Sequence, residues 1–400
     1  MNRASIVVAA SLGLLYRTPR PGLDGASIDL AELGKGLPRG FKLGAATAAH
    51  QVEGGRDNDW TAWERTAFPD GRPHAKHNDP SGLACDSWNR FKEDLQMLNQ
   101  LGAKSYRFSV EWSRLEPRRG EWNAEAMDRD VFWTRRLREE GIEPLVTVWH
   151  FTLPTWVAEQ GAFENAQSIA DTEAFTVRLA QALGPTVDGW VTLNEPNIHA
   201  AKGYLQGEWP PGRKGDTRTQ AQVMANLLRA HAKMAAALRT HDTADADGDT
   251  HATRVSVAHH ARIFQPATNS TLDTAIAGLT DDFFNESVPR ALVTGRIRLS
   301  VPGTLETDEQ VDGLKGSIAY LGLNCYARVP VRADLSNPAL SNQYVRSGGP
   351  TNDQGWEPSP DGLYLLLMRL NAWGVPLVIT ENGLADSLGE DRRAFLAEHL

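Results

Sequence analysis

The chain has 400 residues, of which 41% are hydrophobic and 23% charged, so it can bury a large core in one big domain or two smaller ones. Its formal net charge at pH 7 is −9, without a basic block, which argues against nucleic acid or an anionic membrane surface as a partner. Cys85 and Cys325 are its only cysteines, which excludes a disulfide framework, and neither lies in a C-x-x-C motif.

The first 25 residues are predicted to be an N-terminal extension, followed by one domain over residues 26–400. Arg3 precedes an apolar run, residues 4–16, whose length is that of the hydrophobic part of a secretory signal and not of a transmembrane helix. No convincing cleavage site follows this run. The sequence therefore leaves both a cytoplasmic and an exported location open.

From residue 41 onward, apolar β-type runs alternate with segments whose apolar residues recur at helical spacing, which indicates parallel βα units. The predicted strands are residues 41–51, 105–112, 143–151, 189–194, 254–264, 317–326 and 375–380. The predicted helices between them include residues 86–101, 128–140, 219–239 and 361–373. This alternation predicts an α/β fold, a (β/α)₈ TIM barrel in which seven strands are evident and the eighth is missing from the chain.

A barrel without its eighth strand would expose an edge between the seventh strand and the first, and proteins normally cover such edges. Three explanations stay open. The chain could be a fragment of a longer protein, which is the explanation we prefer. Alternatively, the apolar residues 5–15 could fold into the gap, or a partner or second copy of the chain could supply the strand.

Polar and aromatic side chains gather at the predicted carboxyl ends of the strands, where a barrel places its active site. Two glutamates stand out, Glu195 in Asn194-Glu195-Pro196 and Glu381 before Asn382-Gly383. Either motif alone could be a plain turn, since Asn-Gly after an apolar run is a common hairpin signal. Their joint occurrence after the fourth and seventh strands indicates paired carboxylate chemistry.

Further motifs accompany the two glutamates. They are the segment at residues 41–54, which includes Ala49-His50-Gln51-Val52-Glu53-Gly54, then Tyr106-Arg107-Phe108-Ser109, Trp112-Ser113-Arg114, His150 and Pro154. On these motifs the chain resembles glycoside hydrolase family 1, the β-glucosidase family of retaining barrel enzymes, over about residues 38–400. The resemblance implies hydrolysis of the β-O-glycosidic bond of small β-glucosides or related glycosides through a covalent glycosyl-enzyme intermediate, without a cofactor or metal.

The resemblance also implies roles for individual residues. Glu381 matches the family's nucleophile, and Glu195 matches its acid and base. A charged nucleophile nearby is expected to raise the pKa of Glu195, so that this carboxyl keeps its proton. Arg107 and Tyr326 match residues that support the nucleophile. The matching substrate-binding residues are Gln51, His150, Asn194, Asn324 and Trp356.

Two histidines, the type of bond cleaved and the preferred sugar need separate interpretation. His259 and His260 are interpreted as solvated loop residues, because no third ligand falls at metal-binding spacing. Plant thioglucosidases of the family have glutamine at the acid position, so Glu195 favours an O-glycosidase. The preferred sugar, plain or phosphorylated, is left undecided, because the family's remaining sugar contacts follow the eighth strand. A catalytically weak or inactive sugar-binding barrel is the alternative function.

Overall fold

The computed structural model describes residues 36–400 except 56, 302–304, 335–341, 345–350 and 390. The predicted N-terminal extension and the segment at residues 5–15 lie outside the described residues. The prediction that a partner or second copy supplies a strand stays a prediction. Among the described helices, none combines the length and the apolar character that crossing a membrane requires.

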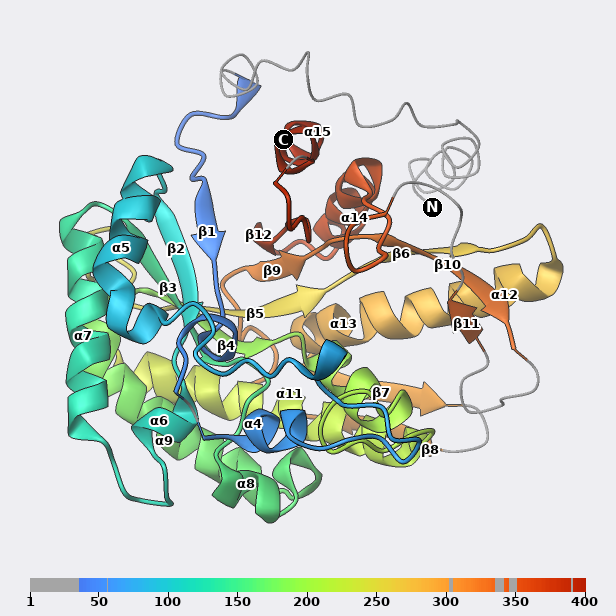
Figure 1. The fold of residues 1–400 in the computed structure, drawn as a ribbon, viewed down its shortest axis with the longest axis horizontal. Coiled ribbons are helices and arrows are strands. Elements are labelled where there is room, and N and C mark those ends of the chain that lie inside the picture. Colours follow the sequence, from blue (N-terminus) through green and yellow to red (C-terminus); the bar gives the residue numbers. More distant parts are fainter. Residues whose placement is uncertain (1–35, 56, 302–304, 335–341, 345–350, 390) are drawn as a thin grey trace.

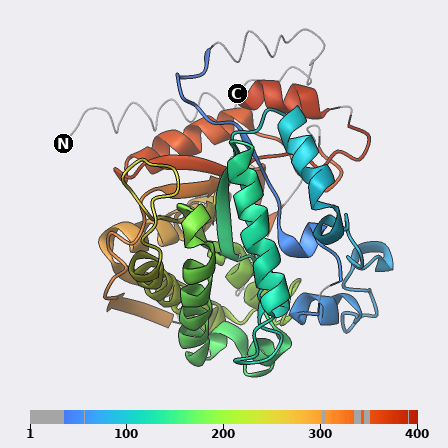
Figure 2. The same cartoon turned by 90° about the vertical axis from the view of Figure 1, so that its left-hand side faces the viewer.

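Seven parallel strands form the central sheet and curve around a common centre, with helices on the outside (Figures 1 and 2). In the order of their pairing they are β1 (Gly44–Ala46), β2 (Ser105–Ser109), β3 (Glu143–Trp149), β4 (Gly189–Asn194), β5 (Arg254–His260), β9 (Leu321–Asn324) and β12 (Leu377–Glu381). Within the described residues no eighth strand joins this sheet, so β1 and β12 are its edges. The barrel prediction is confirmed, with seven strands in a nearly closed barrel.

The longer helices cover the outside of the barrel. They are α5 (Ser87–Gln100), α7 (Ala124–Glu139), α9 (Gln167–Leu183), α11 (Thr217–His241), α12 (Thr271–Asp281), α13 (Ser287–Thr294), α14 (Pro360–Asn371) and α15 (Arg392–His399). Three of them begin at a side-chain cap, where Asn123, Asp216 and Ser270 accept hydrogen bonds from backbone N–H groups of the first turn of α7, α11 and α12. The four predicted helices agree with α5, α7, α11 and α14 to within a few residues.

Short helical segments lie in the connections between these elements, several of them directly after a strand. They are α3 (Ala49–Val52), α4 (Asp59–Glu64), η2 (Lys76–Asn78), α6 (Trp112–Leu115), α8 (Thr155–Glu159), η3 (Ala162–Glu164), η4 (Gly184–Thr186), α10 (Pro196–Ala200), η5 (Ala201–Leu205) and η6 (Asp282–Glu286). Two predicted strands were too long for this reason. The first contains β1 and then α3, and the second ends at Ser109, before α6.

The fifth predicted strand was also wrong in extent, because the chain changes sheet after His260. Residues 263–266 form β6 (Ile263–Pro266), which pairs with β10 (Arg328–Ala333) in a separate three-stranded sheet completed by β11 (Asn342–Tyr344). A further hairpin joins β7 (Arg296–Val301) to β8 (Leu305–Gln310). The sequence patterns predicted neither of these additions.

The core lies between the barrel strands and the helices around them. All six residues of β4 are buried, because the strand has neighbours on both edges and packs on both faces. By contrast, Val378 and Ile379 of the edge strand β12 remain 39% exposed. Trp112, Trp149 and Trp190 are among the largest fully buried side chains, so these tryptophans fill the core.

Candidate active site

Glu195 is the first residue after β4, and its backbone turns the chain sharply. Its φ of 45° lies in the left-handed region, which a residue with a side chain adopts at a cost of about 1–3 kcal/mol. Pro196 then begins α10, and the N–H of Glu195 donates to the carbonyl of Ala258 on β5 at 2.7 Å. This anchored turn fixes the backbone that carries the Glu195 carboxyl at the barrel's carboxyl end.

Glu381 is the last residue of β12, and both of its carboxylate oxygens accept hydrogen bonds. Arg107 Nη1 donates to Oε1, and the Tyr326 hydroxyl donates to Oε2. Arg107 is itself held in place, because its Nε donates to Thr147 Oγ1 at 2.9 Å. The predicted neighbours of Glu381, Arg107 and Tyr326, therefore do contact it.

A hydrogen-bond network joins the two glutamates. Arg107 Nη2 donates to Asn194 Oδ1 at 2.7 Å, and Asn324 Nδ2 donates to the same oxygen at 3.1 Å. Asn324 Nδ2 also donates to Glu195 Oε1 at 2.8 Å. Arg107 thus contacts Glu381 on one side and connects to Glu195 through two asparagines on the other.

His150 joins this network through Asn194. The Nδ2 of Asn194 lies 3.1 Å from His150 Nε2, and since an amide N–H can only donate, Nε2 is the acceptor. Burial lowers the pKa of His150 to about 3, and the charge of Arg107 adds to this effect. His150 is therefore neutral, with its proton on Nδ1, which is buried and has no partner within the described residues.

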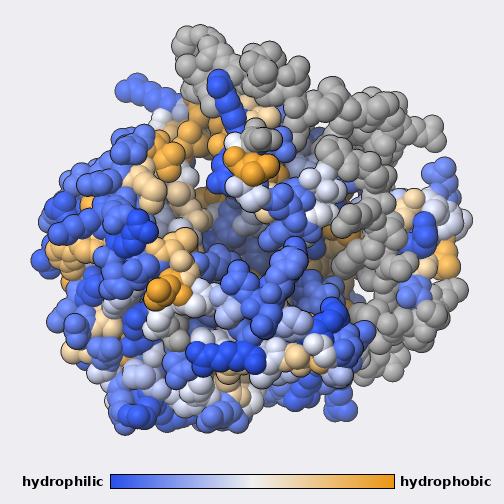
Figure 3. Space-filling model, in the orientation of Figure 1, coloured by the Kyte–Doolittle hydropathy of each residue, from blue (hydrophilic) through white to orange (hydrophobic). Residues whose placement is uncertain are grey.

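The remaining predicted site residues are less closely connected. Gln51 is exposed on α3 and its side chain makes no hydrogen bond within the described part of the chain, so no side-chain hydrogen bond links it to the glutamates. Trp356 is 36% exposed, and its ring centroid lies 5.8 Å from that of Tyr326. Figure 3 shows a hollow near the centre of the molecule, at the place where Figure 1 draws β5 and β9, with mostly hydrophilic residues inside it.

The sequence interpretation of His259 and His260 was wrong, because both are buried on β5 and neither lies in a solvated loop. His260 Nδ1 lies 2.7 Å from Glu195 Oε1, and Arg262 Nε lies 2.7 Å from His260 Nε2. His260 is thus a direct neighbour of Glu195 that the sequence reasoning missed. Its position at the end of the strand after β4 was the available signal.

The pKa of Glu195 also departs from expectation. Burial raises this pKa, but the charge that His260 carries when protonated, together with hydrogen bonds from His260 and Asn324, lowers it to about 2. With a protonated His260 beside it, the pKa of Glu195 is therefore lowered and not raised as Glu381 alone predicts. The protonation state of His260 becomes the decisive question for Glu195.

Residues 34–395 match the family model described as glycosyl hydrolase family 1. The protein belongs to this family. It is 33% identical over 370 residues to a 1,4-beta-D-glucan glucohydrolase from Thermotoga neapolitana, covering 88% of this chain and 83% of that protein. It is 32% identical to Beta-glucosidase A from Thermotoga maritima over 380 residues, covering 90% and 81% of the two chains.

Solved structures of family 1 enzymes share the fold. A beta-glycosidase from Pyrococcus horikoshii superposes with a TM-score of 0.78 at 31% identity, over 91% of this chain and 80% of that chain. A family 1 glycoside hydrolase from Thermotoga maritima, complexed with a cyclophellitol analogue, gives a TM-score of 0.80 at 28% identity, over 90% and 84%. This family 1 member is therefore a retaining β-glycosidase acting on O-glycosyl bonds, and nothing favours the inactive alternative.

One acidic residue of the first family motif lies away from the two glutamates. Glu53 Oε2 lies 3.2 Å from Arg114 Nε, and its side chain lines a small cavity together with Asp130 and Arg129. Burial raises the pKa of Glu53 to about 8, and the charge of Asp130 adds to this effect. The family motif thus contributes a mostly buried carboxyl with a raised pKa at the end of α3.

This carboxyl predicts how the stability of the family 1 barrel varies with pH. Between the ordinary pKa of 4.5 and the folded pKa of about 8, Glu53 is protonated when folded and ionised when unfolded. Unfolding then releases a proton, so stability falls as the pH rises from about 5 to 8. We expect the thermal midpoint to fall less steeply over this range in Glu53→Gln than in the wild type. Equal slopes would contradict the raised pKa.

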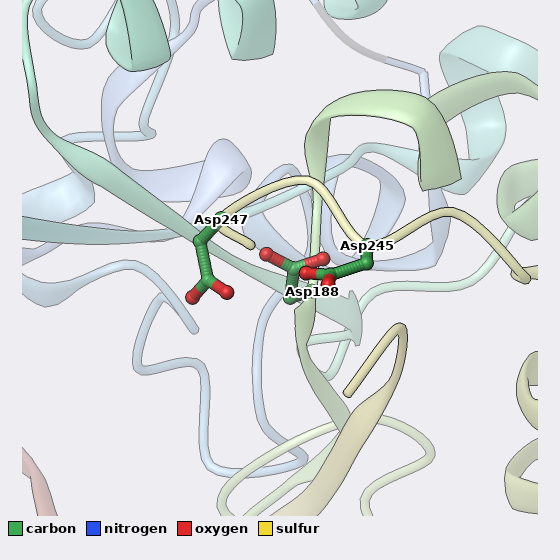
Figure 4. A group of neighbouring side chains, drawn as sticks. All are labelled: Asp188, Asp245 and Asp247. Carbon is green, nitrogen blue, oxygen red and sulfur yellow. The ribbon is translucent and has the colours of Figure 1, made fainter. Parts of the chain in front are cut away.

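A second group of carboxylates lies before the start of β4, at the end of the barrel away from the glutamates (Figure 4). The ligand atoms of Asp188, Asp245 and Asp247 lie within 4.8 Å of one another. Arg138 Nη2 donates to Asp188 at 2.7 Å, and Arg254 Nη2 donates to Asp247 at 2.8 Å. Backbone N–H groups donate to Asp245. Since these donors already compensate the charges, we assign no metal to this cluster.

Proposed function

We propose that this family 1 glycosidase hydrolyses β-glucosides, including short β-1,4-linked glucosides, with Glu381 as the nucleophile and Glu195 as the acid and base. The names of the two Thermotoga relatives support the glucoside class. The single observation that carries the assignment of roles is the network from Glu381 through Arg107, Asn194 and Asn324 to Glu195. It fixes both carboxyls at the carboxyl ends of their strands, β12 and β4.

In the first step, a carboxylate oxygen of Glu381 attacks the anomeric carbon, and the bond from that carbon to the leaving oxygen breaks. Arg107 and Tyr326 hold the attacking group with one donor on each oxygen, which orients it and limits its rotation. Glu195 gives its proton to the leaving oxygen. The step leaves a glycosyl ester on Glu381 and a carboxylate on Glu195.

In the second step, the Glu195 carboxylate takes a proton from water, and the water oxygen attacks the anomeric carbon from the opposite face to Glu381. The ester bond between that carbon and Glu381 breaks, which releases the sugar and restores the Glu381 carboxylate. Two inversions at the same carbon give net retention. Glu195 is well placed as the base, since Asn324 and His260 both face its Oε1 and keep the carboxyl in one orientation.

The sugar would be bound by Gln51, His150 and Asn194, and the leaving group would pack against Trp356. His150 and Asn194 are supported by their place in the network beside Glu195. Gln51 rests on the family resemblance alone. Trp356 is supported by its half-exposed ring beside Tyr326.

The test follows hydrolysis of cellobiose and of 4-nitrophenyl β-glucoside by proton NMR. We expect the β-anomer of glucose to appear first and the α-anomer only later, by mutarotation. Glu381→Gln is the matched control, since it keeps the shape of the side chain and removes its charge. Initial release of the α-anomer would reject retention. Glucose binding without hydrolysis in both proteins would favour a sugar-binding barrel.

A further inference from the structure

We propose that Arg262 holds His260 in its neutral form with the proton on Nδ1, so that Glu195 carries its catalytic proton on Oε2. His260 and Arg262 are then positioning residues for the acid and base. The proposal rests on the proposed role of Glu195 and adds two residues that the family resemblance did not indicate.

The contact with Arg262 determines the tautomer of His260. Arg262 Nε lies 2.7 Å from His260 Nε2, and a guanidinium nitrogen can only donate. Nε2 must therefore be the acceptor, which places the single imidazole proton on Nδ1. A proton on Nε2 would point at the N–H of Arg262, so this contact disfavours the imidazolium form.

The two carboxyl oxygens of Glu195 differ in their hydrogen bonds. His260 Nδ1–H and Asn324 Nδ2–H both donate to Oε1, at 2.7 and 2.8 Å. Oε2 has no hydrogen-bond partner in the described part of the chain, and it is not among the buried unpartnered atoms, so it keeps some accessible surface although the side chain is only 8% exposed. Because Oε1 already accepts two hydrogen bonds, the proton for the leaving group resides on Oε2.

Aromatic rings keep Arg262 in place. Its guanidinium carbon lies 5.7 Å from the ring centre of Phe284 and 5.6 Å from that of Trp356. The ring of His260 also packs edge-on against Phe284, with ring centres 5.8 Å apart. Aromatic rings thus flank the pair formed by Arg262 and His260, which lies where the chain leaves β5 for β6.

The charges around the pair act in both directions. Burial lowers the pKa of His260, Glu195 and Glu381 raise it, and Arg262 lowers it, with a lowered pKa as the net result. His150 lies near Glu195 and is neutral. The neighbouring His259 is neutral as well, since burial lowers its pKa to about 3. Arg262 is therefore the cation that opposes protonation of His260 by direct contact.

The chemical consequence is a choice between two arrangements of one proton. A single proton shared by the pair can sit on Glu195 as a carboxylic acid or on His260 as an imidazolium beside a carboxylate. Only the first arrangement can protonate a leaving group directly. By disfavouring the second, Arg262 increases the fraction of protein that is ready for the first chemical step.

The first test reads the tautomer without any substrate. Histidine ¹⁵N NMR of the full chain should show a neutral Nδ1–H ring for His260 from pH 5 to 8, assigned by its loss in His260→Asn. In Arg262→Met, the same ring should become an imidazolium at neutral pH. An imidazolium or an Nε2–H ring in the wild type would overturn the proposal, whether or not the protein hydrolyses glycosides.

The second test is the pH profile of kcat/KM for methyl β-glucoside, whose poor leaving group needs the proton. In Arg262→Met, we expect the plateau of kcat/KM to fall about tenfold or more, since a neighbouring charge changes a pKa by about 1–3. The apparent pKa of the alkaline limb should rise by the logarithm of the same factor, about 1 for a tenfold fall. The mutant and wild-type profiles should then converge at high pH. A uniform loss at every pH, with no movement of the limb, would indicate a merely structural role and reject the proposal.

His260→Asn provides the matched background, because its amide keeps an N–H near the place of Nδ1 and cannot become a cation. Adding Arg262→Met to this background should cause no further fall of the plateau, since Arg262 acts through the histidine. An equal fall in both backgrounds would mean that Arg262 acts directly on the substrate. If the wild type hydrolyses no glycoside, the proposed function fails, whereas the NMR result still decides the tautomer.

Discussion

Glu381→Ala should hydrolyse β-glucosides about four orders of magnitude or more slower than the wild type. Removal of a covalent nucleophile has effects of this size in other enzymes. The physical reason is that no other described carboxylate is held by both Arg107 and Tyr326. Circular dichroism and thermal unfolding should confirm that the variant folds. The rate is measured with 2,4-dinitrophenyl β-glucoside, so that protonation of the leaving group is not limiting.

Azide separates the loss of the nucleophile from a damaged site. In Glu381→Ala, the anion can enter the space of the missing carboxylate and attack the anomeric carbon from that side. The expected product is the α-glucosyl azide, with restored release of dinitrophenol. Glu381→Gln is the control, since its amide leaves no such space and should not respond. Failure of azide to restore any turnover in the alanine variant, if it is folded, would count against Glu381 as the nucleophile.

The barrel strands could be predicted from sequence because parallel strands buried on both faces appear as short apolar runs. The positions of the strand ends were predicted less accurately, since an apolar run that begins as a strand can continue in another element. Residues 254–264 illustrate this, because the chain leaves β5 after His260 and enters a different sheet at Ile263. The choice of partner for β6 depends on β10, more than 60 residues later, and local patterns do not contain it.

That the two glutamates lie at the same end of the barrel could be predicted, because each follows a predicted strand of one parallel sheet. The contact of His260 with Glu195 could not be predicted. A histidine after an apolar run gives the same sequence pattern whether it faces solvent or a carboxylate. The register that pairs Asn194 with Ala258 brings the end of β5 beside Glu195, and only the folded sheet reveals it. The expectation for the pKa of Glu195 was incomplete for the same reason, since it considered Glu381 and not the donors from β5 and β9.

Glu195→Ala should slow substrates with poor leaving groups much more than activated ones. General acid catalysis is worth about 10² to 10⁴-fold, so kcat/KM for methyl β-glucoside should fall by that factor while the value for 2,4-dinitrophenyl β-glucoside changes little. The alkaline limb of the pH profile should disappear, because the group that must stay protonated has been removed. Equal slowing of both substrates would reject Glu195 as the acid.

The base role of Glu195 makes a separate prediction for the same variant. With 2,4-dinitrophenyl β-glucoside, the glycosyl-enzyme should accumulate in Glu195→Ala, because water attacks slowly without a base. Azide needs no base, so it should restore kcat and give the β-glucosyl azide, the opposite anomer to that expected from Glu381→Ala. Glu195→Gln keeps the side-chain shape and should respond far less. The two anomers, one from each variant, would therefore place the two carboxyls on opposite faces of the sugar, as net retention requires.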